Sequence, residues 1–69
     1  MYDRSFNLTQ IEIQILQLVA EGMDNVEIAK TLFISRHTVK AHLTSAYRKL
    51  NATNRANAVY VAMKQQYIN

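Results

Sequence analysis

The chain has 69 residues, of which 49% are apolar, and a formal net charge of +3, so it is long enough for one small domain. It has no cysteine and only two histidines, which excludes disulfides and thiolate metal sites, and we expect neither a metal nor a cofactor. No apolar run approaches the roughly 18 residues of a membrane span, and no signal-peptide pattern begins the chain, so we expect a cytoplasmic protein with no membrane partner.

The sequence has no proline, a single glycine and no hairpin signal, which predicts an all-α fold. Residues 1–7 show no periodicity and are expected to be a flexible N-terminal end or the remnant of a linker, followed by one domain over residues 8–69. Thr9 and Glu12 form a capping-box pattern, so the first helix should begin there and end at Gly22. The apolar side of this helix comprises Leu8, Ile11, Ile15, Leu18 and Val19, with Leu16 at its edge.

A second capping-box pattern, Asp24 with Glu27, predicts a short helix that runs to about Phe33. Its expected buried residues are Ile28, Ala29, Leu32 and Phe33. Ser35 is the expected N-cap of a third helix. The apolar stripe of that helix comprises Val39, Leu43, Ala46 and Leu50. Two short helices around so tight a break are typical of a helix-turn-helix, with the later one as recognition helix.

Asn54 is predicted to cap a fourth helix that runs to about Gln65. This segment offers more apolar surface than one face against a small core needs, which indicates a homodimer contact. The residues expected in that contact are Val59, Tyr60, Ala62 and Met63, with Tyr67 beyond them. An equally favoured alternative places Val59 and Ala62 wholly in the core of the monomer.

The charges are unevenly distributed along the chain. All five acids lie at or before position 27, whereas seven of the eight basic residues follow Ile28. A basic half of this kind suits a polyanionic partner. The charge asymmetry alone is equally consistent with basic residues that merely solvate a helical surface.

The third helix adds a more specific signal, because small and hydrogen-bonding side chains flanked by cations lie opposite its apolar stripe. Lys40 can donate to guanine, Thr44 can bond a donor or an acceptor edge, and the Ala41 methyl group can meet a thymine methyl group. The expected base contacts are therefore His37, Lys40, Ala41 and Thr44, although His37 could equally meet a phosphate. The expected phosphate contacts are Asn25, Ser35, Arg36, Thr38, Arg48 and Lys49. The sequence thus predicts binding to double-stranded promoter DNA.

These residues together resemble the DNA-binding domain of LuxR/FixJ-type bacterial transcription regulators, which include NarL-type response regulators. The resemblance covers about residues 8–68. The matching positions are Leu8-Thr9, Glu12, Gly22, Asn25, Glu27-Ile28-Ala29, Ile34-Ser35, Thr38-Val39-Lys40, His42, Lys49-Leu50, Arg55 and Ala58-Val59. It implies a four-helix domain that places its third helix in the major groove of a two-fold symmetric promoter site and dimerises through its fourth helix. It also implies that Glu12 and Arg55 organise the fold rather than touch DNA.

The resemblance further implies an N-terminal receiver or sensor domain in a full-length protein. Ile11, Ile13 and Val26 stand where relatives usually carry polar residues, which indicates a contact with that domain or with RNA polymerase. Two alternatives to independent DNA binding are a helical protein-interaction module and a helix-turn-helix that works only inside polymerase. Catalysis is not expected, because no carboxylate follows Ser35, His37 or His42 to orient a catalytic imidazole.

Overall fold

The computed structural model describes residues 7–69, and within them it contains helices and no strand. The elements are α1 (Gln10–Ala20), α2 (Asn25–Leu32), α3 (Arg36–Leu50) and α4 (Arg55–Lys64). The predicted all-α architecture with four helices is confirmed. The flexible end expected at residues 1–7 lies, except for Asn7, outside the described residues.

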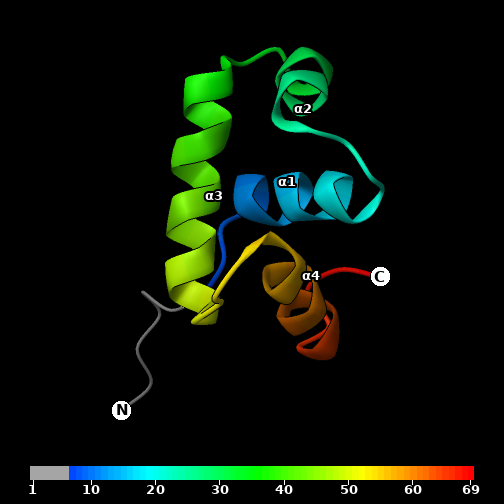
Figure 1. Cartoon of the computed structure of the whole chain (residues 1–69), viewed down its shortest axis with the longest axis vertical. Coiled ribbons are helices and arrows are strands. Elements are labelled where there is room, and N and C mark those ends of the chain that lie inside the picture. Colours follow the sequence, from blue (N-terminus) through cyan, green and yellow to red (C-terminus); the bar gives the residue numbers. More distant parts are fainter. Residues whose placement is uncertain (1–6) are drawn as a thin grey trace.

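The helices are arranged around α1, which lies across the middle of the long α3 (Figure 1). α2 lies near the N-terminal end of α3 and α4 near its C-terminal end. α1 and α3 each pack against the other three helices, whereas α2 and α4 share no packed contact with each other. This arrangement leaves the outer side of α3 free of other helices.

The core comes from the inner sides of all four helices, and its largest fully buried side chains are Ile15, Leu16, Ile28 and Val39. Three alanines, Ala46, Ala58 and Ala62, are also fully buried, where their small side chains let helices approach closely. Leu16 was expected at the edge of the apolar side of the first helix, and this expectation was wrong. Because α1 packs against α2, α3 and α4, more of its circumference is buried than one stripe.

Every helix begins at the predicted cap. The side chains of Thr9 and Asp24 each accept from the backbone amide three residues on, at 3.2 and 2.9 Å, and both capping boxes are complete. Ser35 and Asn54 accept in the same way at 3.0 and 2.8 Å. These bonds satisfy amides that a helix N-terminus otherwise leaves without a partner.

All four helices also end alike, with a residue in the left-handed region. These residues are Gly22, Phe33, Asn51 and Gln66, with φ values of 96°, 59°, 55° and 66°. In each case the backbone amide of the residue that follows the left-handed one donates to a carbonyl oxygen five positions before its own, at 2.9–3.1 Å, as in a Schellman motif. Only Gly22 adopts this conformation without the steric cost that a Cβ atom imposes.

Phe33 corrects the sequence prediction, because its side chain is 92% exposed rather than buried. The helical spacing that placed Phe33 beside Ile28 and Leu32 fails, since the chain leaves the helical conformation at Phe33 itself. The following residue, Ile34, packs against the core instead. Phe33 therefore bears the strain of a left-handed residue without the gain of burial.

We expect Phe33→Gly to raise the free energy of unfolding by about 0.5–1 kcal/mol, because it relieves the left-handed strain and loses almost no buried surface. Urea denaturation measures the change. Gly22→Ala is the matched control and should lower stability by about 1 kcal/mol through its φ value alone, since a Cβ there meets no atom within 4 Å. A destabilised Phe33→Gly protein would contradict this account of the turn.

Candidate nucleic-acid interface

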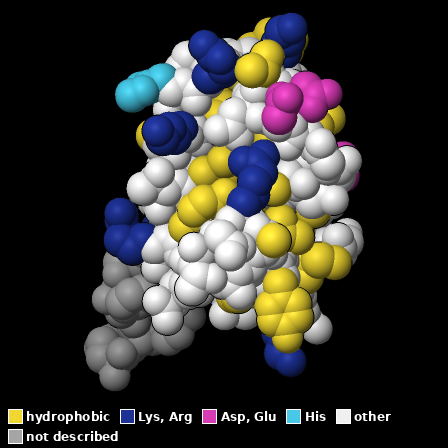
Figure 2. Space-filling model, in the orientation of Figure 1, with side chains coloured by type: hydrophobic (Ala, Val, Ile, Leu, Met, Phe, Trp, Pro, Cys, Tyr) yellow, Lys and Arg dark blue, Asp and Glu magenta, His cyan; other side chains and the backbone are white. Residues whose placement is uncertain are grey.

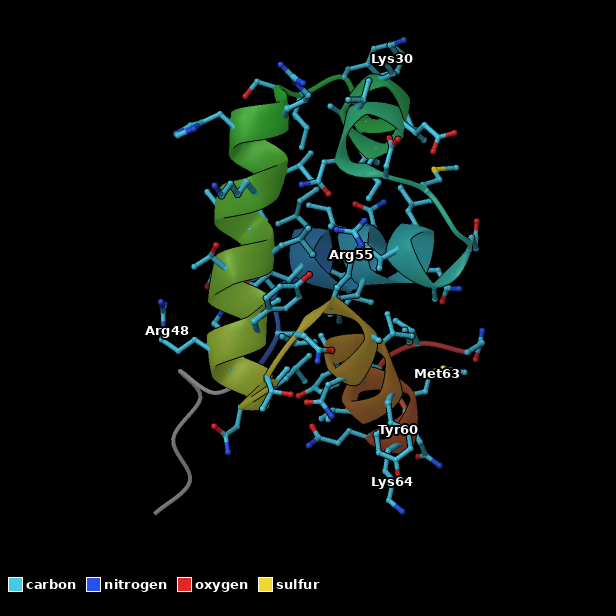
Figure 3. All side chains as sticks on the ribbon, in the orientation of Figure 1. Lys30, Arg48, Arg55, Tyr60, Met63 and Lys64 are labelled. Carbon is cyan, nitrogen blue, oxygen red and sulfur yellow. The ribbon has the colours of Figure 1, made fainter. Side chains whose placement is uncertain are left out.

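The outer face of α3 brings together the predicted base contacts. His37, Lys40, Ala41 and Thr44 are all exposed, and the apolar stripe on the other side of the helix is buried. With Ser45 and Arg48, these four residues line one shallow depression. Figure 2 shows basic side chains and a histidine along the α3 side of the molecule, and Figure 3 shows Arg48 extending away from the body of the protein. The face is cationic and carries no bulky apolar side chain.

The N-terminal ends of α2 and α3 lie next to each other and widen this face. A second depression between them is lined by Asp24, Asn25, Val26, Arg36, His37 and Lys40. Its single acid, Asp24, accepts the backbone amide of Glu27 as a helix cap. The Glu27 carboxylate in turn accepts the amide of Asp24 at 3.0 Å. Both carboxylates are therefore engaged by backbone amides beside the cations.

The hydroxyl groups of Ser35 and Thr38 form a pair at the start of α3. The Ser35 hydroxyl accepts from the Thr38 amide at 3.0 Å and donates to the Thr38 hydroxyl oxygen at 2.9 Å. This leaves the Ser35 proton engaged, whereas the Thr38 hydroxyl proton is free to donate further. Of the two predicted phosphate contacts, Thr38 is the better donor.

Lys49 does not lie on the exposed face, although it was predicted to contact phosphate. Its ammonium group bonds both carboxylate oxygens of Glu12, at 3.0 and 3.2 Å. The Lys49 side chain is 17% exposed and that of Glu12 is 3% exposed. The pattern of basic residues could not separate Lys49 from Arg48, because the partner that draws Lys49 inward comes from a helix distant in the sequence.

The environment of Glu12 keeps it charged. Burial alone raises the pKa of its carboxyl group, because burial disfavours the charged form. The hydrogen bonds from the Thr9 amide, Lys49 and the Ser45 hydroxyl, with the charge of Lys49, outweigh burial and hold this pKa below its ordinary value. Glu12 therefore has the structural position that the family resemblance implied.

Arg55 also makes contacts inside the domain. Its guanidinium group donates to the Asn25 side-chain oxygen at 3.0 Å and to the Met23 carbonyl oxygen at 2.9 Å. Figure 3 shows it between α4 and α2. Arg55 thus links the start of α4 to the start of α2, as expected for a residue that organises the fold.

The α4 residues predicted for a dimer contact fall into two groups. Tyr60 is 60% exposed and Met63 is 47% exposed, and both lie on the side of the molecule away from Arg48 (Figure 3). Val59 is half-buried, and Ala62 is fully buried in the core of the monomer. Ala62 therefore lacks the exposed surface that the predicted contact needs, because its face of α4 points toward the core.

Val26 and Ile13, two of the aliphatic residues that stand where relatives usually carry polar ones, differ in their exposure. Val26 is 37% exposed beside the cations of α3. Ile13 is half-buried and lines an apolar groove between α1 and α2 with Leu18 and Leu32.

The four helices are all too short or too polar to span a membrane within residues 7–69.

The relationship to known proteins agrees with this geometry. Residues 6–62 match the family model described as "Bacterial regulatory proteins, luxR family". The chain belongs to this family. It is 41% identical to the transcriptional regulatory protein LiaR of Bacillus subtilis. This match extends over 63 residues, which are 91% of this chain and 30% of LiaR. It is also 41% identical to the oxygen regulatory protein NreC of Staphylococcus carnosus, over 88% of the chain and 28% of that protein.

A solved structure shares the fold. The response regulator ChrA of a heme-sensing two-component system matches with a TM-score of 0.86 and 44% identity, over 88% of this chain and 30% of that one. This LuxR-family chain thus spans under a third of the length of these proteins. It is a helix-turn-helix domain of response-regulator-type transcription regulators, a family that implies DNA binding rather than catalysis.

We expect Lys49→Met to lower the free energy of unfolding by about 2–3 kcal/mol, because it leaves the buried Glu12 carboxylate without its charged partner. Lys64→Met, at an exposed lysine of α4, is the control and should change little. Urea denaturation at neutral pH measures both. Equal midpoints for the two variants would contradict a structural role for Lys49.

The pKa of Glu12 also predicts a pH dependence of stability. Because this pKa is lower in the folded chain, the stabilisation is complete above the unfolded value of 4.5 and is lost as the pH falls through the folded value. Glu12→Gln should be less stable than wild type at neutral pH and should lose less stability on acidification. Parallel pH curves for the two proteins would show that Glu12 is not the responsible group.

Proposed function

We propose that this domain binds double-stranded DNA sequence-specifically, as the effector domain of a cytoplasmic bacterial transcription regulator of the response-regulator type. The observation that carries the proposal is the outer face of α3. This face is exposed, basic and small enough in its centre to enter a major groove about 12 Å wide. The family membership supports the same conclusion.

In this proposal α3 lies in the major groove and reads base edges with four side chains. Lys40 donates to guanine O6 or N7, Thr44 bonds a polar base edge, and Ala41 meets a thymine methyl group. His37 is closer to the N-terminus of α3 and completes the set of base contacts. Their common exposure on one side of α3 supports this assignment.

The phosphate contacts flank the reading residues. We assign them to Asn25, Arg36, Thr38 and Arg48, with Ser35 acting mainly as the helix cap. Asn25 and Arg36 line the depression at one end of the face, and Arg48 extends from the other end (Figure 3). Lys49 is left out because its ammonium group pairs with Glu12.

We further propose that two copies bind together on a two-fold symmetric site. The exposed side chains of Tyr60 and Met63, with the edge of Val59, provide the apolar contact on α4. They lie away from Arg48, so a second copy docked there leaves the outer face of α3 open (Figure 3). The pair would place two recognition helices about 34 Å apart, one turn of DNA.

The full-length protein would carry an N-terminal receiver or sensor domain, and it would act on RNA polymerase at the promoter. The length of the relatives supports a further domain, since this chain covers 30% of LiaR and 28% of NreC. The apolar groove beside Ile13 and the exposed Val26 are surfaces that such partners could contact.

A protein-interaction module is the competing function, and the exposed Tyr60, Met63 and Val26 favour it. Binding-site selection from a random duplex library, followed by a salt titration, separates the two. DNA affinity should fall steeply with ionic strength because counterions are released, whereas an apolar protein contact should change little. Enrichment of a two-fold symmetric motif supports our proposal, and no enrichment at low salt contradicts it.

Lys40→Ala should weaken binding to the selected site by about 1–3 kcal/mol and relax the preference at one base pair. Arg48→Ala is the matched control, since it removes an exposed cation of the same helix. It should weaken all sequences alike and reduce the salt slope by about 1. Equal losses of specificity in both variants, measured by fluorescence anisotropy, would contradict this division of roles.

Replacing both Tyr60 and Met63 by serine should lower affinity for a duplex with two half-sites by about tenfold or more, because the two copies no longer support each other. The folded monomer should lose little stability, since both side chains are largely exposed. A duplex with a single half-site is the internal control and should bind as tightly as before. An unchanged affinity for the double site would exclude this surface as the dimer contact.

A further inference from the structure

The side chain of Arg55 connects two helices that do not otherwise pack together. Arg55 is the first residue of α4, and Asn25 is the first residue of α2. One terminal nitrogen of the guanidinium group, Nη1, donates to Oδ1 of Asn25 at 3.0 Å. The other, Nη2, donates to the carbonyl oxygen of Met23 at 2.9 Å. Both bonds are partly buried, so the guanidinium group is held at two points of the segment that starts α2.

This contact fixes which way the Asn25 carboxamide faces. A guanidinium group carries donors and no acceptor, so only the carboxamide oxygen can face it. The Asn25 NH2 group then lies on the opposite side of the carboxamide. Within residues 7–69, the Asn25 side chain makes no hydrogen bond other than the one from Arg55, which leaves its two N–H donors for another molecule.

The surroundings of Asn25 suit an anion. Asn25 lines the depression between α2 and α3 together with Arg36, His37 and Lys40. The carboxylate of Asp24, at the same depression, accepts the Glu27 amide as a helix cap. An N–H donor beside two cations and an imidazole matches an oxygen of a DNA phosphate group.

We propose that Arg55 is a positioning residue for DNA binding, which orients Asn25 so that its NH2 group, and not its oxygen, meets a backbone phosphate. The proposal rests on the proposed function and adds to it a residue that does not touch DNA. Without Arg55 the carboxamide can turn by half a rotation and present its oxygen to the phosphate, which repels it. Because Arg55 belongs to α4, the helix of the proposed dimer contact also sets the geometry of a phosphate contact.

The test is a double-mutant cycle of Arg55→Met, Asn25→Ala and the double variant. Affinity for a selected duplex and for an unrelated duplex is measured by fluorescence anisotropy, at a temperature where circular dichroism shows all four proteins folded. Each single variant should bind both duplexes about three- to tenfold more weakly, the effect of one phosphate hydrogen bond, with base preference unchanged. The double variant should bind no more weakly than Asn25→Ala.

The outcomes separate this proposal from the proposed function. If Arg55→Met lowers affinity equally with and without Asn25, Arg55 does not act through Asn25 and the proposal is wrong. If the wild-type protein binds no duplex at low salt, the proposed function fails and the positioning role fails with it. A purely structural Arg55 would change the melting temperature without the coupling between the two positions.

Asn25→Asp keeps the test decisive if Arg55→Met does not fold. The carboxylate should pair with Arg55 and leave the melting temperature unchanged or higher, because a bond between two charged groups replaces one from the guanidinium group to a neutral oxygen. The same variant should bind DNA more than about tenfold more weakly, since a negative charge then faces the phosphate. Wild-type affinity in Asn25→Asp would overturn the proposal.

Discussion

The buried carboxylate of Glu12 links the start of α1 to the end of α3. It caps α1 by accepting the Thr9 amide at 2.9 Å, and it receives the Lys49 ammonium group from the last turn of α3. Both interactions are needed, because a carboxylate that is 3% exposed is stable only when paired and hydrogen-bonded. The ion pair joins the first turn of α1 to the last turn of α3 and, together with the buried apolar stripe of α3, sets the rotation of α3 about its own axis. The direction of every other α3 side chain depends on that rotation.

The rotation of α3 decides which of its cations can meet DNA. Lys49 and Arg48 are neighbours in the sequence, and successive side chains of a helix point about 100° apart. With Lys49 turned toward Glu12, Arg48 is exposed on the same side as Thr44 and Lys40. One lysine thus stabilises the fold while the adjacent arginine remains available for a phosphate. Helix-turn-helix domains need such a division, since the helix that reads DNA must also be packed on the core.

The left-handed residues that end the helices of this domain are mostly not glycines. Three of the four helices end in a left-handed residue that carries a side chain, namely Phe33, Asn51 and Gln66. The left-handed conformation of each costs free energy. It is held by a hydrogen bond from the amide of the following residue to a carbonyl oxygen in the last turn of the helix. The tight break at Phe33 sets the angle between α2 and α3, and with it the depression where Asn25 and Arg36 meet. Strain in the turn and the position of the candidate phosphate site are therefore linked.

The sequence by itself determined the helices, their caps, the turn between α2 and α3 and the polar side of α3, because these depend on residues within one or two turns of each other. Only the tertiary structure decided the burial of Leu16 and Ala62, the exposure of Phe33 and the ion pair of Lys49 with Glu12. Each of these depends on a residue distant in the sequence, or on a local break in the helix. The spacing of apolar residues along the sequence predicts neither. The contact of Arg55 with Asn25, thirty positions apart, belongs to the same class, since it exists only once α4 has packed beneath α1.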